Sequence, residues 1–499
     1  MNLDTSEKYN LIRGLGLVAA ASIIIGNVIG TGVFFKANIM TCNVGSGGWV
    51  IAAWIAAGLL ALAGSLTYAE LTAMKPHAGA EYVLLRDAYG RTSSFLYGWM
   101  QIFIAKTGSM AALAVAFAIV LNTYLNESLS QVLWAPSILG YTLEISLLQI
   151  VAIMVIVIFT TLNSASVAIS GKIATVLTLV KISLVLMVGL GAFAFVSGGS
   201  FGNFGLDSAG AVCEGVNEAQ RYGSAQYSFF AGFAAAMLGA LWGYDGWNQL
   251  TFVAGEVKDP NRNIPIAIIG STILIIFLYV FVHIAYFYVL DPAAIASVSG
   301  EKAVAQVIVE NFFGGDASNL LAGTAVAIFT VGLMMSSLGS LHTSILAGSR
   351  VAYAMAQDKL MFERFGRLSV NGVPLASLIF QGIWAIILTL SGSFDTLTNY
   401  VIFGSFIFYG LITSSVFLFR RRHPELERPY KTWGYPVVPV IFLLVTGWLL
   451  LQTLYDEPRQ SLIGIGLILL GLPVYYFLQS RNGGDDLDEA LEVNDDGQA

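Results

Sequence analysis

Charged residues are scarce in this sequence. Lysine, arginine, aspartate and glutamate make up only 11% of its 499 residues, while hydrophobic residues make up 56%. Soluble domains are about one-quarter charged, so this composition excludes a soluble globular protein. Long apolar runs recur from one end of the chain to the other and leave no room for a large soluble domain. We therefore expect one continuous bundle of membrane-spanning helices.

Histidine is also scarce. The four histidines are scattered along the chain, and no HExxH motif is present; they are His77, His283, His342 and His423. Two histidines at that spacing are what a helix-borne zinc site requires. The sequence therefore predicts neither a metal site nor a cofactor.

The excess of negative charge is confined to one place. The formal net charge is −7, and seven acidic residues follow Arg481, at positions 485, 486, 488, 489, 492, 495 and 496. We expect residues 481–499 to form a solvated, disordered tail, and nothing supports nucleic-acid binding. Residues 1–14 are polar and lack the basic start and cleavage site of a signal peptide, so the first apolar run is retained as a span.

Twelve apolar windows are long enough to cross a bilayer, which takes about 20 helical residues. The windows are 15–39, 49–73, 93–122, 145–163, 167–197, 228–254, 264–290, 318–349, 374–391, 395–419, 437–455 and 461–479. An even number of spans puts both termini on one side of the membrane. We expect a multi-pass protein of a cell membrane, either a plasma membrane or a bacterial inner membrane.

Basic residues fall mostly on one side of these spans. Of the 24 lysines and arginines, 18 lie on the side of the termini, four lie opposite, and Lys106 and Lys181 lie within spans. Because cytoplasmic loops are enriched in basic residues, we place both termini in the cytoplasm. Cys42 and Cys213 then fall on or near the outer side, where a disulfide and two free thiols both remain open.

Two spans are rich in glycine where a membrane helix is usually uninterrupted. The first reads IIIGNVIGTGVFF (23–35), and the sixth reads FFAGFAAAMLGALWGYDGWNQLTFVAGE (229–256). The glycines alone suit helix packing of the GxxxG type. Their corresponding positions, five spans apart, favour broken helices in two inverted repeats. We therefore divide the chain into a first repeat at 15–197, an extracellular loop at 198–227, a second repeat at 228–419, and helices 11 and 12 with their preceding loop at 420–480.

Broken helices offer a defined chemistry. A break exposes N–H groups, which attract an anion, and carbonyl groups, which attract a cation. An α-amino acid carries both charges, so we expect amino acids or related amines as the substrate. The residues predicted to bind its carboxylate are Gly30, Thr31 and Gly32, and those predicted to bind its amine are Trp242, Gly243 and Asp245.

Aromatic residues flank the second break. We expect Trp242 to be a gate because it precedes the bending point at Gly243, with Tyr244, Trp247 and Asn248 in the pocket wall. Aromatic residues of membrane proteins also pack or lie at interfaces, which is the alternative for each of them. Asp245 either contacts a cationic substrate or caps the half-helix that follows.

Lysines within spans are costly and point to function. Lys181 lies in VLTLVKISLVLMVG, where its ammonium either replaces a bound cation or releases a proton during the cycle. The alternative is a lysine that snorkels from a helix end. For Lys106 we expect a structural role as a partner of backbone carbonyls.

Several segments resemble the amino acid–polyamine–organocation superfamily, and specifically its L-amino-acid transporter group. GNVIGTGVF resembles the first-helix motif, and LWGYDGWNQLTFVAGEVKDPNRNIPIAI (241–268) is similar to the sixth-helix signature. YAELTAMKPHAGAEYVLLRDAYG (68–90), SSLGSLHTSILAGSR (336–350) and RRRHPELERPYKTWGYPVVPV (420–440) also resemble this group. The similarity extends to about residue 480.

The resemblance implies an all-α membrane protein with the leucine-transporter fold: twelve transmembrane helices, two inverted five-helix repeats, broken helices 1 and 6, and alternating access. It assigns the carboxylate and amine to the two breaks as above, with Trp242 at the position of an aromatic gate. It also implies that Lys181 stands in for sodium, with Ser336 or Ser337 near it.

Two departures from the group's pattern matter. FKAN (35–38) lacks the proline that often follows the first-helix motif. The loop near 123–144 has no cysteine, whereas light subunits use one there to bond a heavy chain. We therefore expect no disulfide-linked heavy subunit, and the oligomeric state stays open.

Taken together, the sequence predicts a sodium-independent amino-acid exchanger that is not an enzyme. A proton-coupled symporter that uses Lys181 is the alternative within transport. A sensing receptor with the same pocket is an alternative of another class, although no sizeable cytoplasmic signalling domain is present. A hydrolase would have to use Ser200 in GGSFG (198–202), which lies outside the strand-turn-helix context of that motif.

Overall fold

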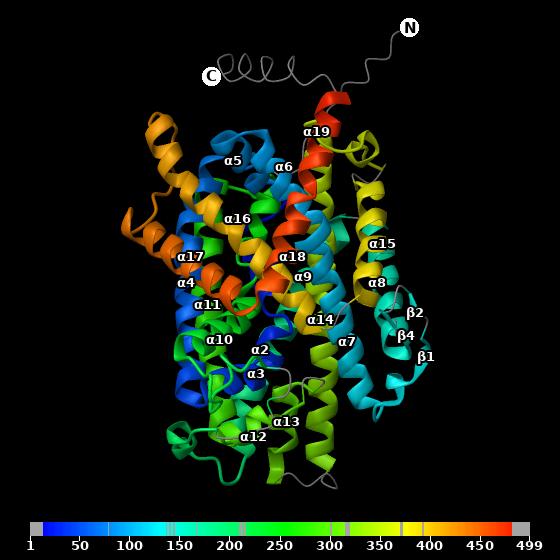
Figure 1. Ribbon diagram of the computed structural model, residues 1–499, viewed down its shortest axis with the longest axis vertical. Helices are drawn as coiled ribbons and strands as arrows, with labels where there is room; N and C mark the ends of the chain where they lie inside the picture. The colour runs from blue at the N-terminus through cyan, green and yellow to red at the C-terminus, as the bar shows by residue number, and fades with distance from the viewer. Residues whose placement is uncertain are drawn as a thin grey trace.

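The computed structural model describes residues 13–481 except for short gaps. The gaps are residues 78, 136, 139–140, 143–144, 166, 209–212, 214–215, 300–301, 315–319, 370–372 and 392–393. The predicted N-terminal segment up to residue 12 and the predicted acidic tail from residue 482 lie outside the described residues. Figure 1 shows an elongated bundle of helices that run mostly along its long axis.

The described part of the chain is mostly helical. The α-helices are α1 (Leu17–Val28), α2 (Gly32–Phe35), α3 (Ala37–Val44), α4 (Gly47–Met74), α5 (Ala80–Tyr89), α6 (Arg91–Met100), α7 (Lys106–Tyr124), α8 (Leu147–Ala165), α9 (Val167–Phe195), α10 (Phe229–Tyr244), α11 (Pro260–Val289), α12 (Pro292–Ala296), α13 (Val304–Glu310), α14 (Leu320–Gln357), α15 (Leu375–Ser391), α16 (Phe394–Arg422), α17 (Val437–Asp456), α18 (Pro458–Leu469) and α19 (Gly471–Arg481). Helices satisfy their own backbone hydrogen bonds, which a bilayer core requires.

Ten described helical segments are long and apolar enough to cross a membrane. Two shorter apolar helices, Phe229–Tyr244 and Leu375–Leu390, accompany them. Each of the twelve predicted windows overlaps one of these segments. The predicted sixth window extends to residue 254, but α10 ends at Tyr244 because the helix breaks there. The chain is therefore a multi-pass, mostly helical membrane protein.

Four short strands are an exception to the all-α expectation. They are β1 (Val132–Trp134), β2 (Ser137–Ile138), β3 (Tyr141–Thr142) and β4 (Ile145–Ser146). β1 pairs antiparallel with β4, and β2 pairs antiparallel with β3. The fourth predicted window begins near residue 145 and includes β4 at residues 145–146, and the helix α8 itself starts at Leu147.

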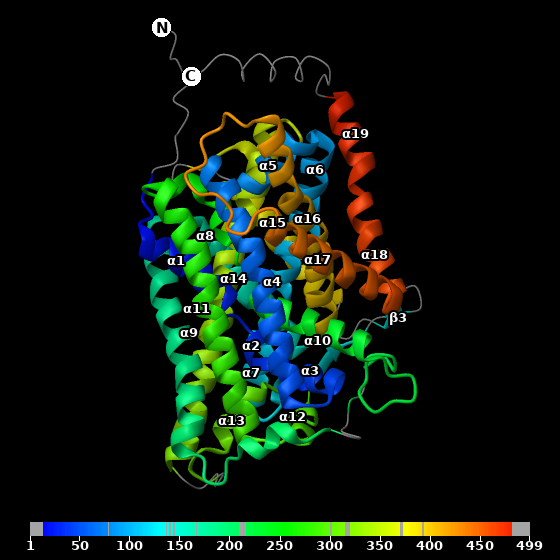
Figure 2. The ribbon, with the colours of Figure 1, turned by 90° about the vertical axis from the view of Figure 1, so that its left-hand side faces the viewer.

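The broken first span lies inside the bundle. α1 packs against α9, α11 and α14, and α10 packs against α3 and α4. α17, α18 and α19 lie along one flank (Figure 2), and only 22% of the residues in the apolar window of α17 are buried. The two glycine-rich segments thus meet in the protected interior.

One end of the bundle carries α5 and the end of α19 (Figures 1 and 2). Ion pairs tie its segments together: Lys75 to Asp87 at 2.6 Å, Arg86 to Asp358 at 3.0 Å, and Arg420 to Glu70 at 2.7 Å. The backbone of Leu15, just before α1, exchanges hydrogen bonds with Glu256 and Lys258 at 2.9 and 2.8 Å. These contacts hold the start of the first span against the segment that follows the second break.

The opposite end carries α12 and α13. Here Cys42 in α3 forms a disulfide with Cys213 in the loop that precedes α10. Of the two states that the sequence left open, the structure has the disulfide. The bond ties α3 to the loop that precedes α10.

Candidate functional site

The first break lies between α1 and α2. α1 ends at Val28, and the Gly30 N–H donates to the Val28 carbonyl at 2.7 Å across a tight turn at Ile29 (φ −70°, ψ 84°), as in an inverse γ-turn. The N–H groups of Thr31 and Gly32 have no hydrogen-bond acceptor within the described part of the chain. Two of the three predicted amides are therefore available, while that of Gly30 is already used.

The second break follows α10. Gly246 has φ +101°, a conformation that suits glycine, and a Cβ there would collide with the Asn27 side chain. Beyond it the chain forms two 3₁₀ turns, η4 (Gln249–Phe252) and η5 (Ala254–Glu256), before α11. The sixth span therefore does not resume as a regular α-helix after the break.

The carbonyls of the second break have protein partners. The Trp242 carbonyl accepts the Asp245 N–H at 3.3 Å. The hydroxyl of Tyr279, from α11, lies 2.9 Å from the Gly243 carbonyl and 2.8 Å from the Val28 carbonyl. Because a hydroxyl has only one hydrogen, Tyr279 serves one carbonyl at a time. The other oxygen can accept from a ligand.

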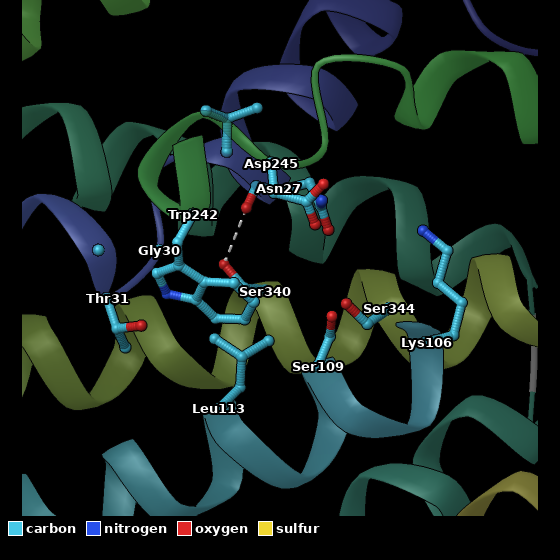
Figure 3. Close-up of a pocket in the computed structure, with 12 residues that line it drawn as sticks. Asn27, Gly30, Thr31, Lys106, Ser109, Leu113, Trp242, Asp245, Ser340 and Ser344 are labelled. Atoms are coloured by element: carbon cyan, nitrogen blue, oxygen red, sulfur yellow. Dashed lines mark hydrogen bonds between the residues drawn. The ribbon is translucent and has the colours of Figure 1, made fainter. Parts of the chain in front are cut away.

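A small cavity lies between the two breaks, and its volume is about 30 Å³. The lining residues come from five helices and the two breaks (Figure 3); they are Asn27, Val28, Gly30, Thr31, Gly32, Lys106, Ser109, Leu113, Trp242, Asp245, Ser340 and Ser344. Such a volume holds only one or two water molecules. A larger ligand therefore requires the surrounding side chains to move.

The predicted site residues divide into two groups. Gly30, Thr31, Gly32, Trp242 and Asp245 line the cavity. Gly243, Tyr244, Trp247, Asn248, Lys181, Ser336 and Ser337 are not among the lining residues. The first group brings together segments more than 200 residues apart in sequence.

Thr31 offers an unused polar atom. Its side chain is 1% exposed, and its Oγ1 has no hydrogen-bond partner among the described residues. Figure 3 shows the Thr31 side chain at one end of the cavity, near Gly30. An unpaired buried hydroxyl costs about 1–3 kcal/mol, so it is well placed to bind a ligand.

The aromatic residues near the second break have different positions. The Trp242 indole lies over the cavity (Figure 3). Tyr244 instead donates to the Trp54 carbonyl at 3.1 Å, and Trp247 packs between the rings of Tyr68 and Tyr409. Tyr244 and Trp247 therefore do not line this cavity, because both rings are occupied in the packing of neighbouring helices.

Lys181 connects the first break to α14. It is completely buried, and its Nζ donates to the Gly26 carbonyl at 2.5 Å and to the Ser340 hydroxyl at 2.7 Å. Ser340 is thus its serine partner, rather than Ser336 or Ser337. The hydroxyls of Ser336 and Ser337 have other acceptors. Ser336 donates to the Ile29 carbonyl at 3.3 Å, and Ser337 donates to the Leu333 carbonyl of its own helix at 3.1 Å.

Asp245 and Lys106 bring opposite charges to the cavity. Tyr409 donates to the Asp245 carboxylate at 3.0 Å, so this carboxylate faces a neighbouring helix as well as the cavity. Lys106 donates to the Gln249 side-chain carbonyl at 3.0 Å and lies 4.3 Å from the centre of the Phe252 ring. The expected backbone partners of Lys106 are therefore replaced by a side-chain amide and an aromatic face.

Glu81, on α5, is a buried acid that the sequence did not single out. Its carboxylate accepts from Tyr97 at 2.7 Å, Asn248 at 2.6 Å and Thr251 at 2.8 Å. Burial raises the pKa of Glu81, and these hydrogen bonds act in the opposite direction. Asn248 therefore holds α5 against the segment after the second break rather than lining the cavity.

Residues from distant helices complete the site. Tyr279 and Tyr409 were missed because each lies in an ordinary helical stretch with no local motif. Ser340 and Glu81 were missed because nothing within the segments 336–350 and 68–90 singles out these two residues. The only available signal was the clustering of polar residues in SSLGSLHTS (336–344), an unusually polar stretch for the middle of an apolar helix. Polar residues inside a span generally face the bundle interior.

The structure also bears on a serine-hydrolase site at Ser200 and on a metal site. Ser200 is the N-cap of a 3₁₀ turn at Phe201–Gly205, where its Oγ accepts the Gly202 N–H at 3.0 Å. Within the described residues, no group of three or more histidine, cysteine or acidic side chains is arranged to hold a metal. Polar groups at the two breaks, by contrast, line a shared cavity.

Known proteins are similar to this chain over most of its length. The sequence profile of the amino acid permease family matches residues 15–477. The chain is 28% identical to the b(0,+)-type amino acid transporter 1 of Mus musculus over 94% of this chain and 88% of that protein. It is also 28% identical to the large neutral amino acids transporter small subunit 2 of Oryctolagus cuniculus, over 93% of this chain and 80% of that protein.

Proposed function

This chain belongs to the amino acid permease family, and from that premise we propose that it is a sodium-independent exchanger of L-amino acids. The observation that carries the proposal is the meeting of two broken helices around one cavity, with two free amides on the first break and carbonyls on the second. A zwitterion matches both sets of groups. The relatives named as amino acid transporters support the same class of substrate.

In this proposal the fold is that of the leucine transporter. The two broken spans are the first helices of inverted repeats at 15–197 and 228–419, and α17 with the α18–α19 segment adds two helices at 420–480. The packing of α1 and α10 in the interior and of α17 on the flank supports this arrangement. Alternating access then moves the repeats around a fixed site.

The amides of Thr31 and Gly32, with the Thr31 hydroxyl, bind the substrate carboxylate. The carbonyls of Trp242, Gly243 and Asp245 bind its amine. When the substrate binds, the Tyr279 hydroxyl donates to the Val28 carbonyl and leaves the Gly243 carbonyl free for the amine. Trp242 is the gate, because its indole is the aromatic side chain that lines the cavity. The cavity of about 30 Å³ corresponds to a closed conformation that widens when Trp242 moves.

Lys181 replaces a coupling cation. Its ammonium reaches the Gly26 carbonyl, in the last turn of α1 before the break, and the α14 hydroxyl of Ser340. Carbonyl and hydroxyl oxygens are the ligands that sodium binds in transporters with broken helices. An ammonium at this point would remove the need for sodium, which agrees with sodium-independent transport. Ser336 and Ser337 have no part in this interaction.

Both termini face the cytoplasm in the proposed orientation. The basic residues gather at the α5 end, and the disulfide lies at the other end. Disulfides persist where the compartment is oxidising, which agrees with an outer location for Cys42 and Cys213. With both cysteines joined to each other, neither is available to a heavy subunit, so we propose that the chain transports without one.

Uptake into sodium-free proteoliposomes tests the proposal. Labelled neutral amino acids are expected to enter only vesicles preloaded with unlabelled amino acid, and a pH gradient is expected to have no effect. Uptake that requires an inward proton gradient and no internal amino acid would support the proton-coupled alternative instead. Binding of an amino acid without flux in either condition would indicate a receptor.

A further inference from the structure

Lys106 and Asp245 share one cavity, and neither has a role in holding the substrate's carboxylate. In Figure 3, Thr31 and Gly30 lie at one end of the cavity and Lys106 at the other, with Asp245 between them. If the two breaks hold the amino and carboxyl groups, the end with Lys106 is left for the substrate's side chain. This step rests on the proposed function.

The charges at this end compensate each other. Lys106 and Asp245 interact electrostatically across the cavity. Glu81 also attracts Lys106, but its carboxylate does not line the cavity and is occupied by three donors. The side-chain end of the cavity therefore holds one positive and one negative charge.

Lys106 is held firmly in this position. Gln249 accepts from its Nζ and in turn donates to the Thr343 carbonyl at 3.2 Å, while the Phe252 ring lies beneath the ammonium. The α-helix gives way to a π-helical turn at Gln101–Ala105, directly before Lys106. Such turns are rare and frequent at functional sites, because they change the direction of the side chains that follow.

We propose that Lys106 sets the substrate specificity by neutralising Asp245, so that the transporter takes amino acids with neutral side chains and rejects cationic ones. A cationic side chain would meet the Lys106 ammonium, and like charges at close range cost several kcal/mol. An anionic side chain would be repelled by the Asp245 carboxylate for the same reason. The small polar groups of Ser109 and Ser344 at this end suit neutral polar side chains.

Competition for uptake of a labelled neutral amino acid tests the proposal. The wild-type protein should be inhibited by unlabelled neutral amino acids and only weakly by arginine or glutamate. Lys106→Gln should strengthen inhibition by arginine about tenfold relative to a neutral amino acid, which is equivalent to about 1.4 kcal/mol. Asp245→Asn should strengthen inhibition by glutamate in the same way, and the double variant should return to the wild-type ranking.

Lys302→Gln is the matched control. It removes a lysine that pairs with Glu310 at 2.7 Å and does not line the cavity, so it should leave the ranking of inhibitors unchanged. Strong inhibition of the wild type by arginine would overturn the proposal without any variant. An unchanged ranking in both single variants would also overturn it. A wild-type protein that takes up no amino acid would instead overturn the proposed function.

Discussion

Gly32 packs against Gly243 with no room for a side chain between them. A Cβ atom added to Gly32 would lie 2.7 Å from the Gly243 Cα and 2.9 Å from its nitrogen, closer than real Cβ contacts. The two residues lie 211 positions apart in a sequence of 499 residues (243 − 32), one in each broken span. The backbones of the two breaks therefore touch directly, and the site depends on this contact.

Gly32→Ala is expected to separate the breaks and to abolish transport. The added methyl meets backbone rather than a flexible side chain, and overpacking of this kind costs about 1–3 kcal/mol. Uptake into proteoliposomes and the thermal midpoint in detergent are the measurements. Gly48→Ala is the matched control, since a Cβ there has nothing within 4 Å. Normal substrate affinity in Gly32→Ala would show that the breaks do not need this contact.

Thr31→Val should weaken substrate binding without destabilising the protein. The substitution keeps the shape and removes a hydroxyl that has no partner in the described part of the chain. A hydrogen bond to a charged group contributes about 1.5–3 kcal/mol, so the KM should rise by about tenfold or more. Thr330→Val, which removes a hydroxyl bonded to the Val326 carbonyl of its own helix, should leave the KM unchanged. An unaltered KM in Thr31→Val would exclude the hydroxyl as a ligand.

Lys181→Met should abolish exchange, and Ser340→Ala should reduce it. The first removes the charge and both hydrogen bonds to the first break and α14, while the second removes one partner. Exchange rates at a series of substrate concentrations are the measurement. Ser337→Ala is the control, because the Ser337 hydroxyl bonds to its own helix. A larger loss in Ser337→Ala than in Ser340→Ala would contradict the assignment of the partner.

Glu81→Gln should flatten the pH dependence of stability. The pKa of Glu81 is raised by burial, so the folded protein holds this proton more tightly than the unfolded chain. The tighter binding of this proton stabilises the folded protein fully below the ordinary carboxyl pKa of about 4.3. This stabilisation is lost as the pH rises through the raised pKa of Glu81 in the folded protein.

Thermal midpoints measured between acidic and neutral pH check this sign. The variant, which has no charge to bury, should equal the wild type at the acidic end and exceed it at neutral pH. Glu363→Gln is the control, because that glutamate is exposed and pairs with Arg367 on the surface. A variant that is less stable than the wild type only at neutral pH would contradict the prediction.

The positions of the helices and of the two breaks could be predicted from the sequence because both depend on local patterns. An apolar run of sufficient length has few alternatives to a membrane helix, and glycines in corresponding spans mark the breaks. The sequence alone therefore assigns Gly30, Thr31, Gly32, Trp242 and Asp245 to a common site, and these residues line one cavity.

The partners of these residues could not be predicted, because they depend on how helices are rotated against one another. Ser336, Ser337 and Ser340 lie within five residues of one another, yet only Ser340 contacts Lys181. Tyr279 lies in an apolar helix whose sequence gives no sign that its hydroxyl reaches both breaks. Trp247 follows the break as closely as Trp242 precedes it, and packing alone directs it away from the cavity.

The most direct test of the central claim is a structure determined with a transported amino acid bound. The account predicts that the carboxylate lies within hydrogen-bond distance of the Thr31 and Gly32 N–H groups, with the amine at the carbonyls of the second break and Trp242 moved aside. Density for the amino acid away from the two breaks, or a carboxylate bound by Lys106 instead of these amides, would contradict it.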